Sequence, residues 1–193
     1  SINVNRRPSL SDGTLFTGRN WDGFVDREVG VVVIDDKQGN PIATILNYTC
    51  HPTILGPANK LLSPDYPGTA RKVVEQHVGG ICLFLQGAAG NCGPTHGFIG
   101  DVSVAKRLGT RLGLEAAKVR LETDPIPRTE RLVEVVPSGA DLGMYEDDPA
   151  GEPDDSLRIV NTNVELPIGQ FPSIADAQAD FDQAVAFLNT TRK

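Results

Sequence analysis

The run at residues 81–85 is the feature that most limits the fold, because all of its residues are apolar. A short, wholly apolar run is typical of a central strand that is covered on both faces. Two more strands are predicted upstream, at 28–35 and 41–49, and a polar turn at 36–40 joins them into a hairpin. We expect these three strands to belong to one sheet.

Two amphipathic helices accompany the strands. Residues 65–78 carry apolar residues at helical spacing, and Gly79 and Gly80 end that helix. The clearest helix is at 101–122, and its apolar stripe consists of Val104, Leu108, Leu112, Ala116, Val119 and Leu121. We interpret its basic residues as a solvated side and not as a binding face: Lys106, Arg107, Arg111 and Lys118. Because such strands and helices can bury their apolar faces only in layers, the predicted fold class is α/β, a mixed β-sheet with helices packed on it.

The two ends of the chain carry fewer signals. The first 27 residues predict loop with at most short strands, and a strand is expected at 131–136. Residues 138–156 are acidic and rich in Gly, Pro and Asp, which favours an exposed excursion. A helix capped by Ser173 is expected to run to residue 188.

Composition narrows the classes of protein. The formal net charge is −7 and no basic run is longer than Arg6-Arg7, which argues against nucleic acid as a partner. No apolar stretch approaches the roughly 20 residues of a membrane span, and there is no signal peptide. The chain starts Ser-Ile-Asn-Val-Asn without an initiator Met, so we expect it to be an internal fragment of a longer protein.

His51 is the first candidate functional residue, because a strand delivers it directly to a loop rich in Gly and Pro. Sites in α/β proteins lie at such sheet edges. The alternative is an ordinary histidine at a strand end that bonds to the backbone. The other two histidines are His77 and His96, so the chain cannot by itself build a zinc site of three histidines with helical spacing.

A glycine-rich loop at 86–94 is the second candidate. Its backbone amides could hold an oxyanion or a phosphate, although it has neither the Walker ending nor the Rossmann spacing, and a plain tight turn is the alternative. If strands 41–49 and 81–86 run in the same direction, His51 and this loop lie at one edge of the sheet. The three cysteines form no metal or disulfide pattern; Cys82 fits a buried core, and Cys50 or Cys92 would be a nucleophile only beside a base.

Five motifs follow one another in the chain: Asn5-Arg6-Arg7-Pro8, Val25-Asp26-Arg27-Glu28, the strand that ends at His51-Pro52, Leu62-Ser63-Pro64-Asp65-Tyr66-Pro67-Gly68 and Gly90-Asn91-Cys92-Gly93-Pro94. Their order resembles that of the neutral/alkaline (non-lysosomal) ceramidases, a family of zinc amidases that hydrolyse the N-acyl bond of ceramide. The resemblance covers roughly residues 1–125, and residues 126–193 are an extension without a clear match.

The resemblance implies a zinc-dependent hydrolase of an N-acyl bond, in which His51 is one zinc ligand and the other ligands lie outside these 193 residues. Gly90, Asn91 and Gly93 occupy the segment of the family's nucleophile, but Gly93 stands where that serine is expected and Asn91 replaces an acidic residue. Attack by zinc-bound water is the chemistry that would remain, with amides of residues 89–93 stabilising the oxyanion. A non-catalytic ligand-binding or structural domain is the alternative.

The resemblance also implies a small-molecule or lipid amide substrate and a secreted or periplasmic location. Asp65, at the start of the first helix, is predicted to orient an imidazole or a neighbouring loop amide. Its alternative role is to accept hydrogen bonds from backbone amides in the first turn of the helix.

Overall fold

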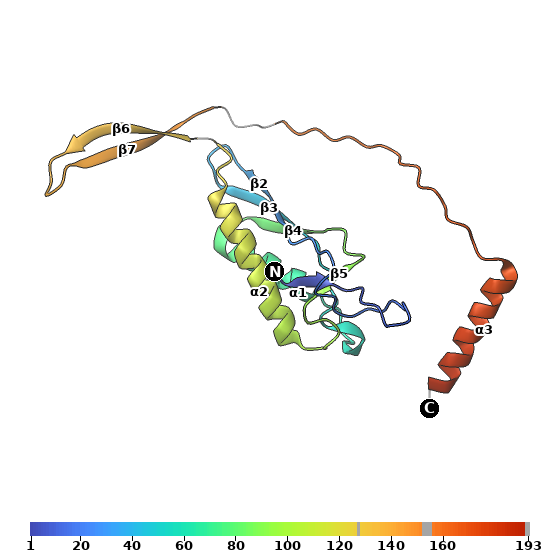
Figure 1. Ribbon diagram of the computed structural model, residues 1–193. Helices are drawn as coiled ribbons and strands as arrows, with labels where there is room; N and C mark the ends of the chain where they lie inside the picture. The colour runs from blue at the N-terminus through green and yellow to red at the C-terminus, as the bar shows by residue number, and fades with distance from the viewer. Residues whose placement is uncertain (127, 152–155, 192–193) are drawn as a thin grey trace. The chain divides into compact units, whose positions relative to one another are not determined.

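The computed structural model describes residues 1–126, 128–151 and 156–191. The chain divides into two compact units, Ser1–Asp154 and Asp155–Lys193. The first unit contains a three-stranded sheet of order β2-β3-β4, formed by Val29–Asp35, Pro41–Tyr48 and Ile81–Gln86 (Figure 1). This arrangement confirms that the three predicted strands share one sheet.

The sheet is mixed, as predicted. Strands β2 and β3 form an antiparallel hairpin, and the carboxylate of Asp36 holds its turn by accepting hydrogen bonds from the amides of Gln38 and Asn40. Strands β3 and β4 pair in parallel, with Ala43 opposite Ile81 and Tyr48 opposite Gln86. A parallel pair needs a crossover, which here contains the helix α1 at Asp65–Val78.

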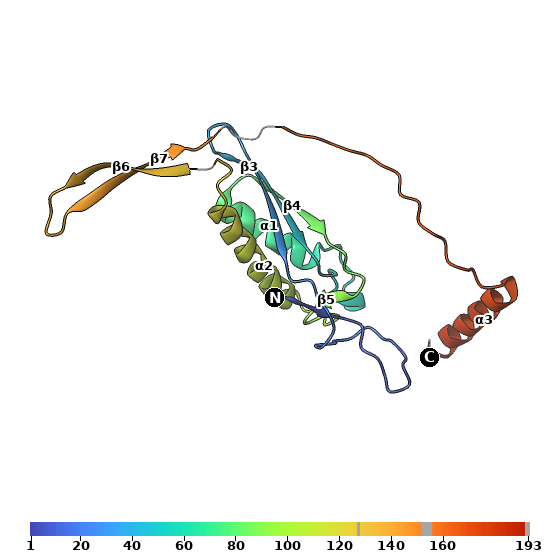
Figure 2. The same ribbon diagram turned by 45° about the horizontal axis from the view of Figure 1, so that its top comes forward.

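Helices α1 and α2, the latter at Val102–Glu122, lie side by side on one face of the sheet (Figures 1 and 2). The fold class is therefore α/β. Asp101 caps α2 by accepting a hydrogen bond from the amide of Ser103 at 2.8 Å. The two helices approach closely because α2 presents Gly109 and Gly113 to α1, where a Cβ would lie within 2.6 Å of a backbone oxygen. The core between the helices and the sheet includes Leu46, Tyr48, Tyr66, Val74, Cys82, Leu108, Leu112 and Ala116.

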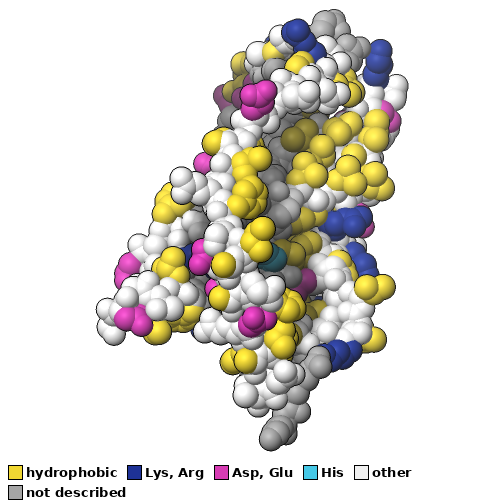
Figure 3. Space-filling view, turned by 90° about the vertical axis from the view of Figure 1, so that its right-hand side faces the viewer, with side chains coloured by type: hydrophobic (Ala, Val, Ile, Leu, Met, Phe, Trp, Pro, Cys, Tyr) yellow, Lys and Arg dark blue, Asp and Glu magenta, His cyan; other side chains and the backbone are white. Residues whose placement is uncertain are grey.

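Strand β4 differs from the prediction, because it is an edge strand with one covered face. Cys82 points into the core, whereas Ile81, Leu83 and Leu85 are 57%, 46% and 51% exposed. The outer face of β2 is likewise open, with Val32 54% exposed. Exposed apolar side chains are also scattered over other parts of the surface, as the space-filling view of one face shows (Figure 3). The apolar run was correctly identified as a strand, but the central strand is β3.

The acidic segment also differs from the prediction. Residues Leu142–Pro149 form strand β7, which pairs antiparallel with β6 at Arg128–Val136. The acidic side chains stabilise this hairpin across the strands, since Arg131 contacts Glu146 at 2.9 Å and Asp148 at 2.6 Å. The segment is exposed, as expected, and its part at 152–155 lies outside the described residues.

The remaining elements are short or separate. Strand β1 at Asn3–Asn5 pairs with β5 at Cys92–Pro94, and a 3₁₀ turn covers Gly56–Ala58. In the second unit, α3 spans Ile174–Thr191, and Ser173 caps it by accepting a hydrogen bond from the amide of Asp176. None of the helices in the described part of the chain is long and apolar enough to cross a membrane.

A buried ion pair fixes the end of α2 against the sheet. Arg120, in the last turn of α2, contacts Asp35 at the end of β2, and the two side chains are only 7% and 8% exposed. Removing one member of a buried pair leaves an uncompensated charge away from water. The pair therefore makes the packing of α2 on β2 specific.

We expect Arg120→Met to lower the free energy of unfolding by about 3 kcal/mol, because the buried carboxylate of Asp35 loses its partner. The double variant Arg120→Met/Asp35→Leu should recover most of that loss. Lys106→Met, at an exposed position of the same helix, is the control and should change stability by less than about 0.5 kcal/mol. Urea unfolding measures all three, and a single-variant cost no larger than the control would contradict this role.

Candidate functional site

The parallel pairing of β3 and β4 brings His51 to the glycine loop. Beyond the last paired residues, the amide of Gly87 donates to the carbonyl of Tyr48 at 3.0 Å. The amide of His51 then donates to the carbonyl of Cys92 at 3.1 Å. The prediction that His51 and the loop meet at one edge of the sheet is confirmed.

Two arginines near the start of the chain donate hydrogen bonds to carbonyls of the glycine loop. The carbonyl of Gly90 accepts hydrogen bonds from Arg6 Nε at 3.2 Å and from an Arg7 guanidinium nitrogen at 2.9 Å. The carbonyl of Asn91 accepts from the amide of Arg6 at 2.7 Å. The carbonyl of Cys92 accepts from the amide of His51, so the three consecutive carbonyls of residues 90–92 all have protein donors. Sequence reasoning missed this arrangement, because Arg6 and Arg7 lie more than 80 residues away from the loop along the chain.

The start of the chain also fixes the end of β3. The Asn3 side-chain amide donates to the carbonyls of Thr49 at 2.7 Å and Asp26 at 2.5 Å. The hydroxyl of Thr49 donates to the Asp26 carboxylate at 2.8 Å, and hydrogen bonds from the Glu28 amide and from Thr49 lower the pKa of Asp26. Segments that are distant in the sequence therefore converge directly upstream of His51.

Most amides of the loop have no protein acceptor. In the described part of the chain, the amides of residues 88–91 donate to no protein atom, whereas the Cys92 amide donates to the Ala89 carbonyl at 3.3 Å. Unpaired successive amides are suited to an oxyanion or another anion. The loop carbonyls are thus occupied by protein contacts, while most of its amides remain open.

The imidazole of His51 is partly buried and lacks an internal partner. Its Nδ1 atom is buried and makes no hydrogen bond to any described residue. Burial, with the positive charge of nearby Arg6, lowers the pKa of His51 below its ordinary value of 6.5. At neutral pH the ring is therefore neutral, which is the form that accepts a proton or binds a metal.

A complete metal site is not formed by the described residues. No group of three or more His, Cys, Asp or Glu side chains among them could hold a metal ion. His77 Nδ1 lies 2.8 Å from the Val73 carbonyl and His96 Nδ1 lies 3.2 Å from Thr95 Oγ1, so neither ring joins His51. His51 fits the chemistry of one zinc ligand, but the described residues do not supply the three or four that a site requires.

Asp65 orients a loop amide and not the imidazole. Its carboxylate accepts hydrogen bonds from the amides of Leu55 at 3.0 Å and Tyr66 at 2.7 Å. Both of the non-imidazole roles weighed for it are thus observed, on the loop and in the first helical turn. Asp65 also lines a cavity of about 350 Å³ together with Pro52 and Thr53, the two residues after His51.

The cysteines near the loop are core residues. Cys50 is fully buried, and burial raises the pKa of its thiol to about 12, so it is not a thiolate at neutral pH. Its carbonyl accepts a hydrogen bond from the hydroxyl of buried Tyr66. Cys82 and Cys92 are also buried, which confirms the expectation for Cys82.

Gly93 lies beneath the side chain of Arg6. A Cβ on Gly93 would come within 3.1 Å of Arg6 Cδ. A serine fits there only if this flexible side chain moves by a few tenths of an ångström. Gly93, which has no hydroxyl, thus lies against the same arginine that binds the loop carbonyls.

Gly87 and Gly90 give a matched pair of loop variants. A Cβ on Gly87 would lie 2.3 Å from Thr49 Oγ1, whereas a Cβ on Gly90 meets nothing within 4 Å. We expect Gly87→Ala to lower the free energy of unfolding by about 1–3 kcal/mol through overpacking, and Gly90→Ala to change it little. Equal unfolding curves for the two variants would show that the close contact with Thr49 does not constrain the loop.

The pKa of His51 gives a second test. Arg6→Gln should raise this pKa toward 6.5, because it removes a positive charge that disfavours the imidazolium. NMR titration of the imidazole C–H resonances measures the shift, and Arg7→Gln is the control. Because the folded state holds the proton more weakly than the unfolded state, wild-type stability should fall as the pH drops through about 6.5. That loss should be smaller in Arg6→Gln.

Known proteins resemble part of this chain, although no family model matches it. Neutral ceramidases A and B of Dictyostelium discoideum are each 34% identical to it, over 79 and 81 residues, which are 40% and 42% of this chain and 11% of each relative. Among solved structures, the neutral ceramidase from Pseudomonas aeruginosa matches 68% of this chain and 23% of that chain at 21% identity, with a TM-score of 0.47. A ceramidase complexed with C2 gives the same coverage and identity, with a TM-score of 0.48. The predicted likeness is therefore confirmed: the chain contains a segment similar in sequence to neutral ceramidases, and the match spans about a tenth of those relatives.

Proposed function

We propose that this chain is part of the catalytic domain of an amide hydrolase of neutral ceramidase type, which cleaves an N-acyl bond in a small-molecule or lipid substrate. The observation that carries the proposal is the contact of His51 with the glycine loop through the Cys92 carbonyl. This backbone hydrogen bond places His51 beside the loop whose amides at residues 88–91 have no protein acceptor among the described residues. The sequence similarity to neutral ceramidases supports the reaction class.

In this proposal each part of the site has a separate role. The amides of residues 88–91 bind the oxygen of the scissile carbonyl as negative charge develops on it. The arginines that hold the Gly90 carbonyl keep those amides in position. His51 is one zinc ligand, and the other ligands come from outside the described residues. A zinc ion there would supply Lewis-acid activation of the carbonyl.

The competing proposal is a ligand-binding domain without catalysis. Gly93 favours it, because a residue without a hydroxyl stands in the segment that resembles the family's nucleophile. The two proposals differ in whether His51 is needed for turnover.

The test uses the natural-length gene product, with elemental analysis for zinc and assays against ceramide and against matched N-acyl amides and esters. His51→Ala should remove the zinc and lower amide hydrolysis by more than about 100-fold. His77→Ala, whose ring Nδ1 lies 2.8 Å from the Val73 carbonyl of its own helix, is the control and should retain both. A wild-type protein without zinc or hydrolysis that still binds the amides would support the non-catalytic alternative.

Gly93→Ser tests the departure from the family pattern in the same assays. A gain in hydrolysis would show that the missing hydroxyl limits the reaction. Unchanged turnover would show that the site does not use a hydroxyl at this position.

A further inference from the structure

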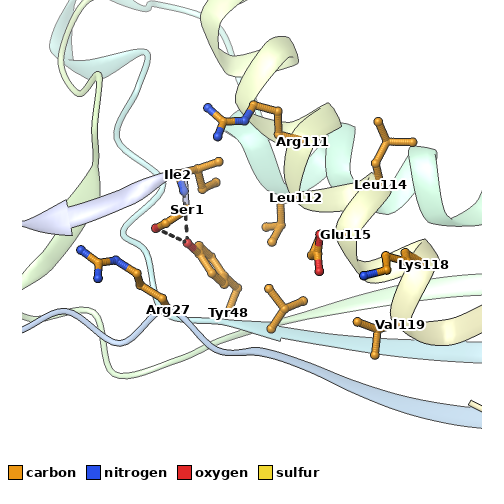
Figure 4. A pocket seen from close by; sticks show the side chains of 11 residues that line it. Ser1, Ile2, Arg27, Tyr48, Arg111, Leu112, Leu114, Glu115, Lys118 and Val119 are labelled. Atoms are coloured by element: carbon orange, nitrogen blue, oxygen red, sulfur yellow. Dashed lines mark hydrogen bonds between the residues drawn. The ribbon is translucent and has the colours of Figure 1, made fainter. Parts of the chain in front are cut away.

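A second cavity, of about 740 Å³, opens between α2 and the hairpin strands (Figure 4). Its volume is within the range of about 300–1,000 Å³ that is typical of small-molecule sites. His51 and the glycine loop do not line it, so it is a different place from the candidate site described above. The cavity combines two kinds of surface, which we name the apolar floor and the basic rim.

The apolar floor consists of Ile2, Val29, Tyr48, Leu112 and Val119. Ile2, Tyr48 and Leu112 are at most 3% exposed and belong to the core, so the half-buried Val29 and Val119 present the more accessible part of the floor. The Tyr48 hydroxyl lies 3.3 Å from Ser1 Oγ and 3.4 Å from the amide of Ile2, which donates to it. This floor offers a fixed apolar surface with one polar atom.

The basic rim consists of Arg27, Arg111 and Lys118. Arg111 and Lys118 extend from α2, and Arg27 comes from the segment before β2 (Figure 4). Glu115 is the one acidic residue that lines the cavity. The helical pattern alone assigns Arg111 and Lys118 to the solvated side of α2, and both are exposed as that pattern predicts.

The charge of the rim is unusual for this chain. The chain has 25 acidic and 18 basic residues, so basic side chains are outnumbered by potential partners. Nevertheless, the side chains of Arg27, Arg111 and Lys118 make no hydrogen bond or ion pair with another residue in the described ranges. Three unpaired cations and one carboxylate therefore surround an apolar floor, which favours an anion over a neutral or cationic ligand.

We propose that this cavity binds a small amphipathic anion, a carboxylate or phosphate monoester with a short alkyl chain. The basic rim holds the head group, and the alkyl chain lies on the apolar floor. Neither surface suffices alone, because exposed charge pairs in water contribute little and the floor by itself does not select for charge. Glu115 opposes the anion and lowers its affinity.

Calorimetric titration of the natural-length gene product tests the proposal with four probes: octanoate, octyl phosphate, octanol and acetate. The two long-chain anions should saturate one site, and their relative affinity distinguishes a carboxylate site from a phosphate site. Octanol lacks the charge and acetate lacks the chain, so both should bind at least about tenfold more weakly.

The variants give effects of opposite sign. Arg111→Gln and Lys118→Gln should each weaken the better anion about threefold to tenfold, whereas Glu115→Gln should strengthen it about twofold to fivefold. Lys106→Gln is the control, because Lys106 is on the same helix but does not line the cavity. All four positions are exposed, so the variants should fold, as circular dichroism will verify.

NMR gives an independent location for the ligand. The methyl resonances of Ile2 and Leu112 should shift on addition of octanoate, and those of α3, which does not line the cavity, should not. Octanol binding as tightly as octanoate would overturn the proposal. It would also be overturned if the glutamine variants of the rim bound the anion like the control.

Discussion

The parallel pairing of β3 with β4 is the interaction on which the rest of the structure depends. It sets Tyr48 opposite Gln86, so the chain leaves both strands at the same edge. Every contact between His51 and the glycine loop follows from that register. A shift by one residue would turn the core-facing Leu46 and Tyr48 outward and would separate Thr49 from Gly87.

The register alone does not hold the loop, because its carbonyls need partners. Those partners come from the start of the chain: β1 pairs with β5, and Arg6 and Arg7 follow β1 directly. The same segment supplies Asn3, which bonds to Thr49 just before His51. Residues 3–7 thus link the end of β3 to the loop, and they do so as donors to its carbonyls, so these contacts leave the loop amides of residues 88–91 without an acceptor.

Local patterns in the sequence predicted most of the fold. The hairpin, both helices of the first unit, and the meeting of His51 with the loop were correct, because each depends on periodicity, turn residues or strand direction. Strand β4 was assigned to the wrong place in the sheet: a wholly apolar run shows that both faces are suited to burial, but not that both are buried among these residues. The acidic strand β7 was missed, since its partner Arg131 lies 15 and 17 residues away from Glu146 and Asp148.

The site was less predictable than the fold, because it depends more on contacts between residues that are far apart along the chain. The roles of Arg6 and Arg7 depend on contacts across more than 80 residues, and no local signal marks them. For Asp65 the sequence left three roles open, the imidazole, a loop amide and the first turn of the helix, and the structure shows the last two. The ring of His51 has no internal partner among the described residues, which no pattern could show.

The central claim is that the start of the chain, the loop and His51 form one hydrogen-bonded unit. Amide hydrogen exchange measured by NMR tests it directly. The amides of Arg6, His51 and Gly87 each donate to a carbonyl of this unit, so we predict that they are protected to a similar degree and open together as denaturant is added. Free exchange of the Arg6 amide while the His51 and Gly87 amides stay protected would contradict the account.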